Sequence, residues 1–177
     1  MATPQPTTDD LRDTSAFEAL MWAMARPGTV QTLPEGMADL AMALLDRETR
    51  AYSDDPILSR QLASTGAAVV PAERADHAFC KTPEGAKAAL AVLPAGSALY
   101  PDEGATLVTQ ASIGTGAVLR LTGPGIEGKA DLRLGDLPDG LFDLRSARCN
   151  YPAGIDILFV DGRRIVGLPR STAVEVL

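Results

Sequence analysis

Histidine and cysteine are nearly absent from the sequence. Its 177 residues contain one histidine, His77, and two cysteines, Cys80 and Cys149, which lie far apart and form no Cys-x-x-Cys pair. Two thiols exclude the disulfide-dense scaffolds of small secreted proteins. Because a zinc site needs three or four ligands, these residues also do not assemble one. We therefore expect no metal site and interpret each cysteine as a small core residue rather than a reactive thiol.

Positive charge and long apolar runs are scarce as well. Sixteen Lys and Arg face twenty-three Asp and Glu, which gives a net charge of −7, whereas nucleic-acid-binding domains are usually basic. No apolar run approaches the roughly 20 residues that span a bilayer. The segment 1–13 is polar and acidic, unlike a signal peptide. The sequence therefore predicts a cytoplasmic protein with neither nucleic-acid nor membrane partners.

The composition that is present fits a globular domain. Hydrophobic residues make up 46% of the chain and charged residues 22%, and a length of 177 residues is typical of one domain. Residues 1–13 (MATPQPTTDDLRD) combine prolines, threonines and aspartates, which predicts a flexible N-terminal tail. A single domain is then expected over residues 14–177.

Helical signals dominate the first half of this domain. Ser15 and Glu18 have the spacing of a capping box, which predicts a helix start at Ser15. An apolar stripe follows at helical intervals, and Pro27-Gly28 ends the helix; the stripe consists of Phe17, Leu20, Met21 and Met24. Further helices are predicted over residues 37–45, 55–64 and 83–93, with a helical or turn-like segment over 138–149.

Strand signals dominate the second half. Short strands are predicted at residues 67–70 and 78–80, and alternating patterns predict longer ones at 106–111, 117–122 and 130–134. The segment 155–160 is apolar on both faces after Asp156, which is typical of a central strand. Asp161-Gly162 then predicts a hairpin into 163–168. Strands interleaved with helices indicate an α/β domain with a mixed sheet.

One glycine-rich segment matches a phosphate-binding pattern only in part. Residues 123–130 (GPGIEGKA) fit G-x-x-x-x-G-K and follow a predicted strand. A working P-loop needs Ser or Thr after the lysine, and here Ala130 takes that place. It also needs a helix, whereas residues 130–134 alternate like a strand. The segment is better interpreted as a tight turn between two strands.

Neither a nucleophile motif nor a catalytic histidine emerges. The sequence holds no G-x-S-x-G, and His77 is interpreted as a structural histidine. Asp156 is unusual because a carboxylate within an apolar strand must be paired or hydrogen-bonded if it is buried. We expect it to hold the preceding turn at residues 151–154, the alternative being that it faces a cleft.

Arginine gathers towards the C-terminus. Within residues 141–170 five arginines face three aspartates, so this stretch is positive in a negative chain; the arginines are Arg145, Arg148, Arg163, Arg164 and Arg170. Arg170 and Ser171 follow a strand end, and guanidinium groups suit phosphate and carboxylate. They are candidates for contact with an anion or a partner; a merely solvated surface is the alternative.

Four collinear segments resemble one family. They are FEALMWAMARPGTV (17–30), EGATLV (103–108), LRLTGPGI (119–126) and YPAGIDILFVDGRRIVGLPRSTAVEV (151–176). Together they resemble the PhnH family, the H subunit of the bacterial carbon–phosphorus lyase core complex, which serves phosphonate metabolism. The resemblance is weakest between residues 37 and 98, where RAYSDD (50–55) replaces a more apolar strand.

The resemblance implies a fold and a function. The implied fold is a three-layer α/β/α sandwich with a mixed sheet, similar to the large domain of pyridoxal-phosphate-dependent transferases but without the cofactor. The implied function is a structural or accessory role, with the G, I and L subunits, in forming ribose 1-phosphonate 5-triphosphate from ATP and an alkylphosphonate. The implied partners are the G, I and J subunits, and a homodimer is expected when the chain is isolated.

The family resemblance assigns no catalytic, metal-binding or cofactor-binding residue, and no independent active site is expected. The alternative function is binding of an anionic phosphonate or nucleotide. Its candidate residues are Arg120, Arg170, Ser171 and Asp156. A cryptic pyridoxal-phosphate enzyme is the third hypothesis, although none of Lys81, Lys87 and Lys129 lies in a convincing Schiff-base setting.

Overall fold

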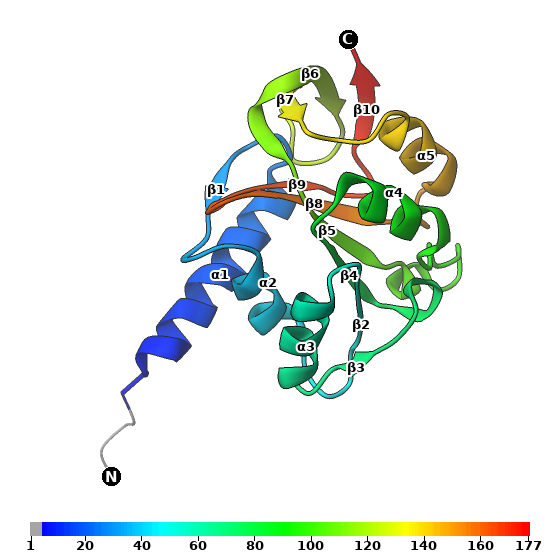
Figure 1. The fold of residues 1–177 in the computed structure, drawn as a ribbon. Coiled ribbons are helices and arrows are strands. Elements are labelled where there is room, and N and C mark those ends of the chain that lie inside the picture. Colours follow the sequence, from blue (N-terminus) through cyan, green and yellow to red (C-terminus); the bar gives the residue numbers. More distant parts are fainter. Residues whose placement is uncertain (1–4) are drawn as a thin grey trace.

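A central mixed sheet organises residues 5–177, the part of the chain that the computed structural model describes (Figure 1). Seven strands of this part lie in the order β1-β9-β8-β5-β4-β2-β3. Their bounds are β1 Gln31–Thr32, β2 Arg50–Ser53, β3 Ala68–Val69, β4 His77–Cys80, β5 Thr106–Gln110, β8 Asp156–Asp161 and β9 Arg164–Leu168. The strands from β3 to β8 are parallel, and β9 and β1 are antiparallel to their neighbours. The predicted α/β class and mixed sheet are confirmed.

A second, antiparallel sheet stands apart from the first. It contains β6 (Ser112–Thr122), β7 (Ala130–Gly135) and β10 (Ala173–Val176), in the order β10-β6-β7. The expectation of one mixed sheet was therefore incomplete, and β10 was not predicted. The glycine-rich segment 123–129 joins β6 to β7. Leu121 of β6 and Ala130 of β7 pair with each other across this turn. This confirms a turn between two strands in place of a P-loop.

Helices cover both faces of the central sheet (Figure 1). Towards one face lie α1 (Thr8–Ala25), α2 (Met37–Leu44) and α3 (Pro56–Ser64). Towards the other lie α4 (Pro83–Val92) and α5 (Leu141–Arg148), together with the smaller sheet. Short 3-10 turns occupy Ala72–Arg74 and Pro101–Glu103. The helices predicted from residues 37, 55 and 83 are confirmed to within two residues at each end.

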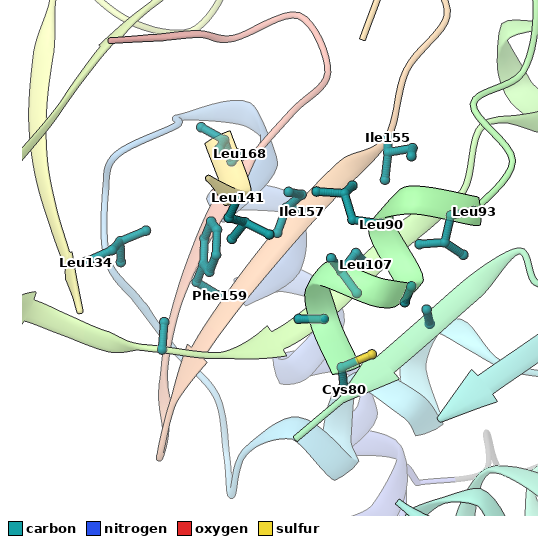
Figure 2. Packing of buried hydrophobic residues seen from close by; sticks show 14 of the residues in the cluster. Cys80, Leu90, Leu93, Leu107, Leu134, Leu141, Ile155, Ile157, Phe159 and Leu168 are labelled. Carbon is teal, nitrogen blue, oxygen red and sulfur yellow. The ribbon is translucent and has the colours of Figure 1, made fainter. Parts of the chain in front are cut away.

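The core consists of one apolar cluster on each face, and β8 contributes to both. Ile157 and Phe159 join the cluster under α4 and α5, which Figure 2 shows from close by. Leu158 and Val160 join the cluster under α1 to α3. Successive side chains of a strand point to opposite faces, so a strand covered on both sides must be apolar at every position. The prediction of a central strand at 155–160 is confirmed.

The first helix begins earlier than predicted. Thr7 is its N-cap: its Oγ1 accepts from the N–H of Asp10, and the Asp10 carboxylate accepts from the N–H of Thr7. Ser15 lies inside the helix and donates to the carbonyl of Leu11, so the predicted start was wrong. The structure thus places residues 8–13 of the expected tail in α1, and residues 1–4 lie outside the described part. The flexibility of the tail itself stays a prediction.

The buried face of α1 also differs from the predicted stripe. Ala16, Ala19, Leu20 and Ala23 are buried, whereas Phe17 and Met21 are 54% and 48% exposed. The cause lies in β9, where a side chain on Gly167 would put its Cβ 2.5 Å from the carbonyl oxygen of Ala23. The α1 backbone therefore rests directly on the strand. Such close packing leaves room for alanine, not phenylalanine, at the interface.

Candidate functional site

The topology of the central sheet indicates one place where α/β proteins bind ligands. Between β2 and β4 the connections depart in opposite directions, β2 leading through α3 to an outer strand and β4 through α4 towards the centre. The crevice at the carboxyl ends of such strands is the usual ligand site. Here Asp54, which directly follows β2, fills it.

Asp54 binds the groups that a phosphate would otherwise use. Its carboxylate accepts from the backbone N–H of Lys81 at 2.8 Å, from that of Thr82 at 3.0 Å and from the Thr82 hydroxyl at 2.5 Å. Thr82 is the N-cap of α4, and helix N-termini attract anions. The chain's own carboxylate, that of Asp54, therefore takes up the donors at this place.

Two of the candidate residues meet at the opposite end of the parallel strands, where β8 begins. Asp156 begins β8, and Arg170 follows the neighbouring end of β9. One carboxylate oxygen of Asp156 accepts from the backbone N–H of Arg170, and the other lies 2.6 Å from its Nη2. Arg170 also donates to the carbonyls of Pro101 and Gly104. The expected role of Asp156 in the 151–154 turn was wrong, since its carboxylate holds Arg170 instead.

Arg120 lies elsewhere, on β6 of the smaller sheet. Its guanidinium pairs with Asp131 on β7 through two hydrogen bonds of 2.9 and 3.0 Å. This pairing raises the pKa of Arg120 and lowers the pKa of Asp131. The structure therefore gives Arg120 a cross-strand partner and does not bring it together with Arg170.

A pocket of about 270 Å³ adjoins Arg170. It lies between α5, the turn after β9, and β10, and Arg170 and Ser171 both line it. The full lining is Phe142, Arg145, Ser146, Cys149, Tyr151, Arg170, Ser171, Thr172, Ala173 and Val174. It holds two arginines and no carboxylate. The sequence placed Arg145 only within an arginine-rich stretch, whereas the structure buries it in this pocket.

The single histidine and the two cysteines lie in surroundings typical of structural residues. Burial lowers the pKa of His77, which lies on β4. Burial likewise raises the pKa of the Cys80 thiol to about 12, so that the thiol stays protonated and unreactive. Both cysteines are free, and Cys149 is only partly buried. Residues 5–177 hold no group of three or more His, Cys, Asp or Glu side chains placed to bind a metal ion.

Large apolar side chains remain exposed on one side of α1. We call this surface the α1 outer face; it consists of Leu11, Phe17, Met21 and Trp22. Arg26 stacks over the Trp22 ring at 4.6 Å from its centroid. Exposed apolar surface of this kind marks sites of protein association. Across residues 5–177, the helices are too short or too polar to cross a bilayer.

Comparison with known proteins shows the family to which the chain belongs. A family model described as "Bacterial phosphonate metabolism protein (PhnH)" matches residues 7–175. The chain belongs to the PhnH family. The match to the family model includes α1, strands of both sheets and the pocket beside Arg170. The resemblance drawn from four short segments is confirmed.

Two curated PhnH relatives match over most of their length. The "Putative C-P lyase subunit protein HtxG" of Stutzerimonas stutzeri is 33% identical over 178 residues, with 93% of this chain and 87% of the relative covered. The "Alpha-D-ribose 1-methylphosphonate 5-triphosphate synthase subunit PhnH" of Rhizobium meliloti (strain 1021) is 31% identical over 180 residues, with 91% and 89% covered. Both relatives are named as subunits of phosphonate-processing systems.

Proposed function

We propose that the chain is a structural or accessory subunit of a carbon–phosphorus lyase system. It acts with the G, I and L subunits to form ribose 1-phosphonate 5-triphosphate, and it assembles with the G, I and J subunits in the cytoplasm. The observation that carries this proposal is the match, over most of the chain, to two relatives named as subunits. The fold likeness to the large domain of pyridoxal-phosphate-dependent transferases is part of the same proposal.

The reaction in which it takes part is a group transfer. A phosphonate oxygen forms a bond to C1′ of the ribose of ATP, the bond from C1′ to adenine breaks, and adenine leaves with a proton. We assign the chemistry to the partner subunits, because Asp54 fills the crevice where an α/β sheet binds its ligand. This chain then contributes to the complex through the surface by which it binds its partner subunits.

The α1 outer face is the surface that we assign to association. When the chain is isolated, a second copy covers this face and a homodimer forms, because apolar side chains are stabilised by removal from water. Phe17 and Met21 lie one turn apart and present adjacent apolar side chains. An aspartate at both positions would place charge in the middle of such an interface.

Co-expression with the G, I and J subunits tests the assembly. We expect the chain to elute with them in size-exclusion chromatography, and alone to elute as a dimer. The double variant Phe17→Asp/Met21→Asp should elute as a monomer, while Ile57→Asp, an equally exposed apolar site on α3, should remain a dimer. A chain that elutes alone at every salt concentration contradicts the proposed assembly.

A second candidate function is binding of an anionic phosphonate or nucleotide. The observation that favours it is the pocket beside Arg170 and Ser171, which two arginines line without any carboxylate. Arg120 contributes nothing to this pocket, and Asp156 lies behind Arg170 as its partner. A candidate site near Arg170 thus gains support, and one that needs Arg120 does not.

A further inference from the structure

The smaller sheet ends in a strand, β10, whose outer side carries unpaired backbone groups. β10 pairs with β6 along one side only. The N–H of Leu177 donates to the carbonyl of Val118, which lies opposite it in the register of the pair. Hydrogen-bonded pairs alternate along an antiparallel ladder, so the N–H and C=O groups of Val174 and Val176 point away from β6. Within residues 5–177 none of these four groups has a backbone partner.

Two pockets adjoin this strand. Val174 lines the pocket beside Arg170, and Val176 lines a larger pocket of about 420 Å³. Phe142 of α5 lines both pockets, so they share a wall between α5 and β10. A strand added beside β10 would place alternate side chains on the same face of the sheet as the two valines. Those side chains would then reach the two pockets, as in proteins that bind an extended segment at a sheet edge.

The larger pocket, which we call the acidic pocket, combines apolar walls with negative charge. Its lining includes three leucines and three aspartates, Leu134, Leu137, Leu141, Asp136, Asp139 and Asp143, and no lysine or arginine. Lys87 donates to the backbone carbonyl of Asp139. In the described part of the chain, however, none of the three carboxylates forms an ion pair. Such a pocket suits the aliphatic stem and the charged head of a lysine or arginine.

The charge of the acidic pocket favours a partner protein over a second copy of this chain. A second copy paired through its own β10 would bring the sequence AVEV, which holds no cation. It would therefore leave the three aspartates uncompensated. A segment with a basic side chain satisfies both the free strand edge and the carboxylates.

We propose that an extended segment of a partner subunit adds to β10 as a further strand and places a lysine or arginine in the acidic pocket. This inference rests on the proposed subunit role and names a surface for it. The surface differs from the α1 outer face, because α1 and the smaller sheet cover opposite faces of the central sheet. Backbone hydrogen bonds to Val174 and Val176 supply affinity, and the pocket selects the basic side chain.

Hydrogen exchange in the assembled complex tests the strand pairing. The full chain is co-expressed with the G, I and J subunits, and its amides are compared with those of the isolated chain. The amides of Val174 and Val176 should exchange at least about tenfold more slowly in the complex, because they become hydrogen-bonded. The matched control is Val69 on the edge strand β3, whose N–H also lacks a backbone partner in the described residues. Its exchange should not change.

A proline at position 176 tests the same pairing by competition. Val176→Pro removes only an N–H that points away from β6, and proline is tolerated at such edge positions. When wild type and variant compete for limiting partner subunits, the variant should enter the complex about tenfold less, because a backbone hydrogen bond is lost. Val176→Thr keeps the N–H and the branched shape and should compete equally with wild type. Thermal unfolding followed by circular dichroism checks that both variants fold.

A charge-neutralising variant tests the acidic pocket. Asp139→Asn/Asp143→Asn should enter the complex about fivefold less than wild type, since an ion pair contributes up to about 1 kcal/mol. The difference should shrink as the salt concentration rises. Glu48→Gln/Glu127→Gln makes the same change of charge at exposed positions elsewhere and should compete like wild type. Equal incorporation of the two double variants overturns the basic side chain in the pocket.

The possible outcomes separate this surface from the subunit role. Co-elution without slower exchange at Val174 and Val176 overturns the added strand and leaves the subunit role intact. Slower exchange of these amides in the isolated chain, increasing with its concentration, assigns the edge to a second copy and also overturns the proposal. A chain that does not co-elute with the partner subunits contradicts both the role and the surface.

Discussion

Replacement of Asp156 by alanine is expected to lower the free energy of unfolding by about 3 kcal/mol. The carboxylate makes close contacts with the backbone N–H and with Nη2 of Arg170, and each side chain of the pair is only 16% exposed. Removal of the carboxylate leaves the guanidinium with two carbonyl acceptors, those of Pro101 and Gly104, and no countercharge. A half-buried cation without its partner is the source of the loss.

Urea unfolding monitored by circular dichroism measures this effect. The control is Asp131→Ala, which breaks the exposed pair with Arg120 on the smaller sheet and should shift the midpoint little, because exposed ion pairs contribute little. The double variant Asp156→Leu/Arg170→Met should recover part of the lost stability, since it removes both charges. Equal midpoints for Asp156→Ala and Asp131→Ala would show that the Arg170 pair does not stabilise the fold.

A single methyl group on Gly167 is expected to lower the free energy of unfolding by about 2 kcal/mol, a typical cost of overpacking a core. The new Cβ would lie 2.5 Å from the Ala23 carbonyl oxygen and 3.0 Å from the Met24 nitrogen. Both are backbone atoms of α1, so no side chain can turn aside to make room. The helix must move away from β9, and its buried alanines lose their contacts.

Amide hydrogen exchange locates this effect. In Gly167→Ala the amides of α1 should exchange faster, while those of β4 and β5 keep their protection. Gly128→Ala is the control, because a Cβ there meets nothing within 4 Å and adds only about 1 kcal/mol for the left-handed backbone. Unchanged exchange in α1 of the Gly167 variant would mean that the helix does not rest on this strand.

The predictable part of the fold follows from local chemistry. The run 155–160 has no polar face after its first residue, and only a strand buried on both sides accommodates such a run. Asp161-Gly162 forms the expected hairpin between β8 and β9. Ala130, in place of a P-loop serine or threonine, correctly indicated a turn at 123–129. In each case residues that are neighbours in the sequence determine the local structure.

The parts that were missed depend on contacts between distant residues. The inward face of α1 is decided by Gly167, more than 140 residues away, so the apolar stripe did not show that Phe17 and Met21 are exposed. Asp156 finds its partner in Arg170, which follows the neighbouring strand β9, and not in the adjacent turn. Arg145 had one local signal: it lies four residues, one helical turn, after Leu141, which is also buried. An arginine on the apolar face of a helix marks a buried charge.

Release of adenine from ATP and methylphosphonate by purified G, I and L subunits tests the central claim most directly. The subunit role predicts that adenine and ribose 1-phosphonate 5-triphosphate form together only when this chain is added. It also predicts that Phe17→Asp/Met21→Asp restores less activity than Ile57→Asp. Equal rates of adenine release with and without the chain would contradict the account.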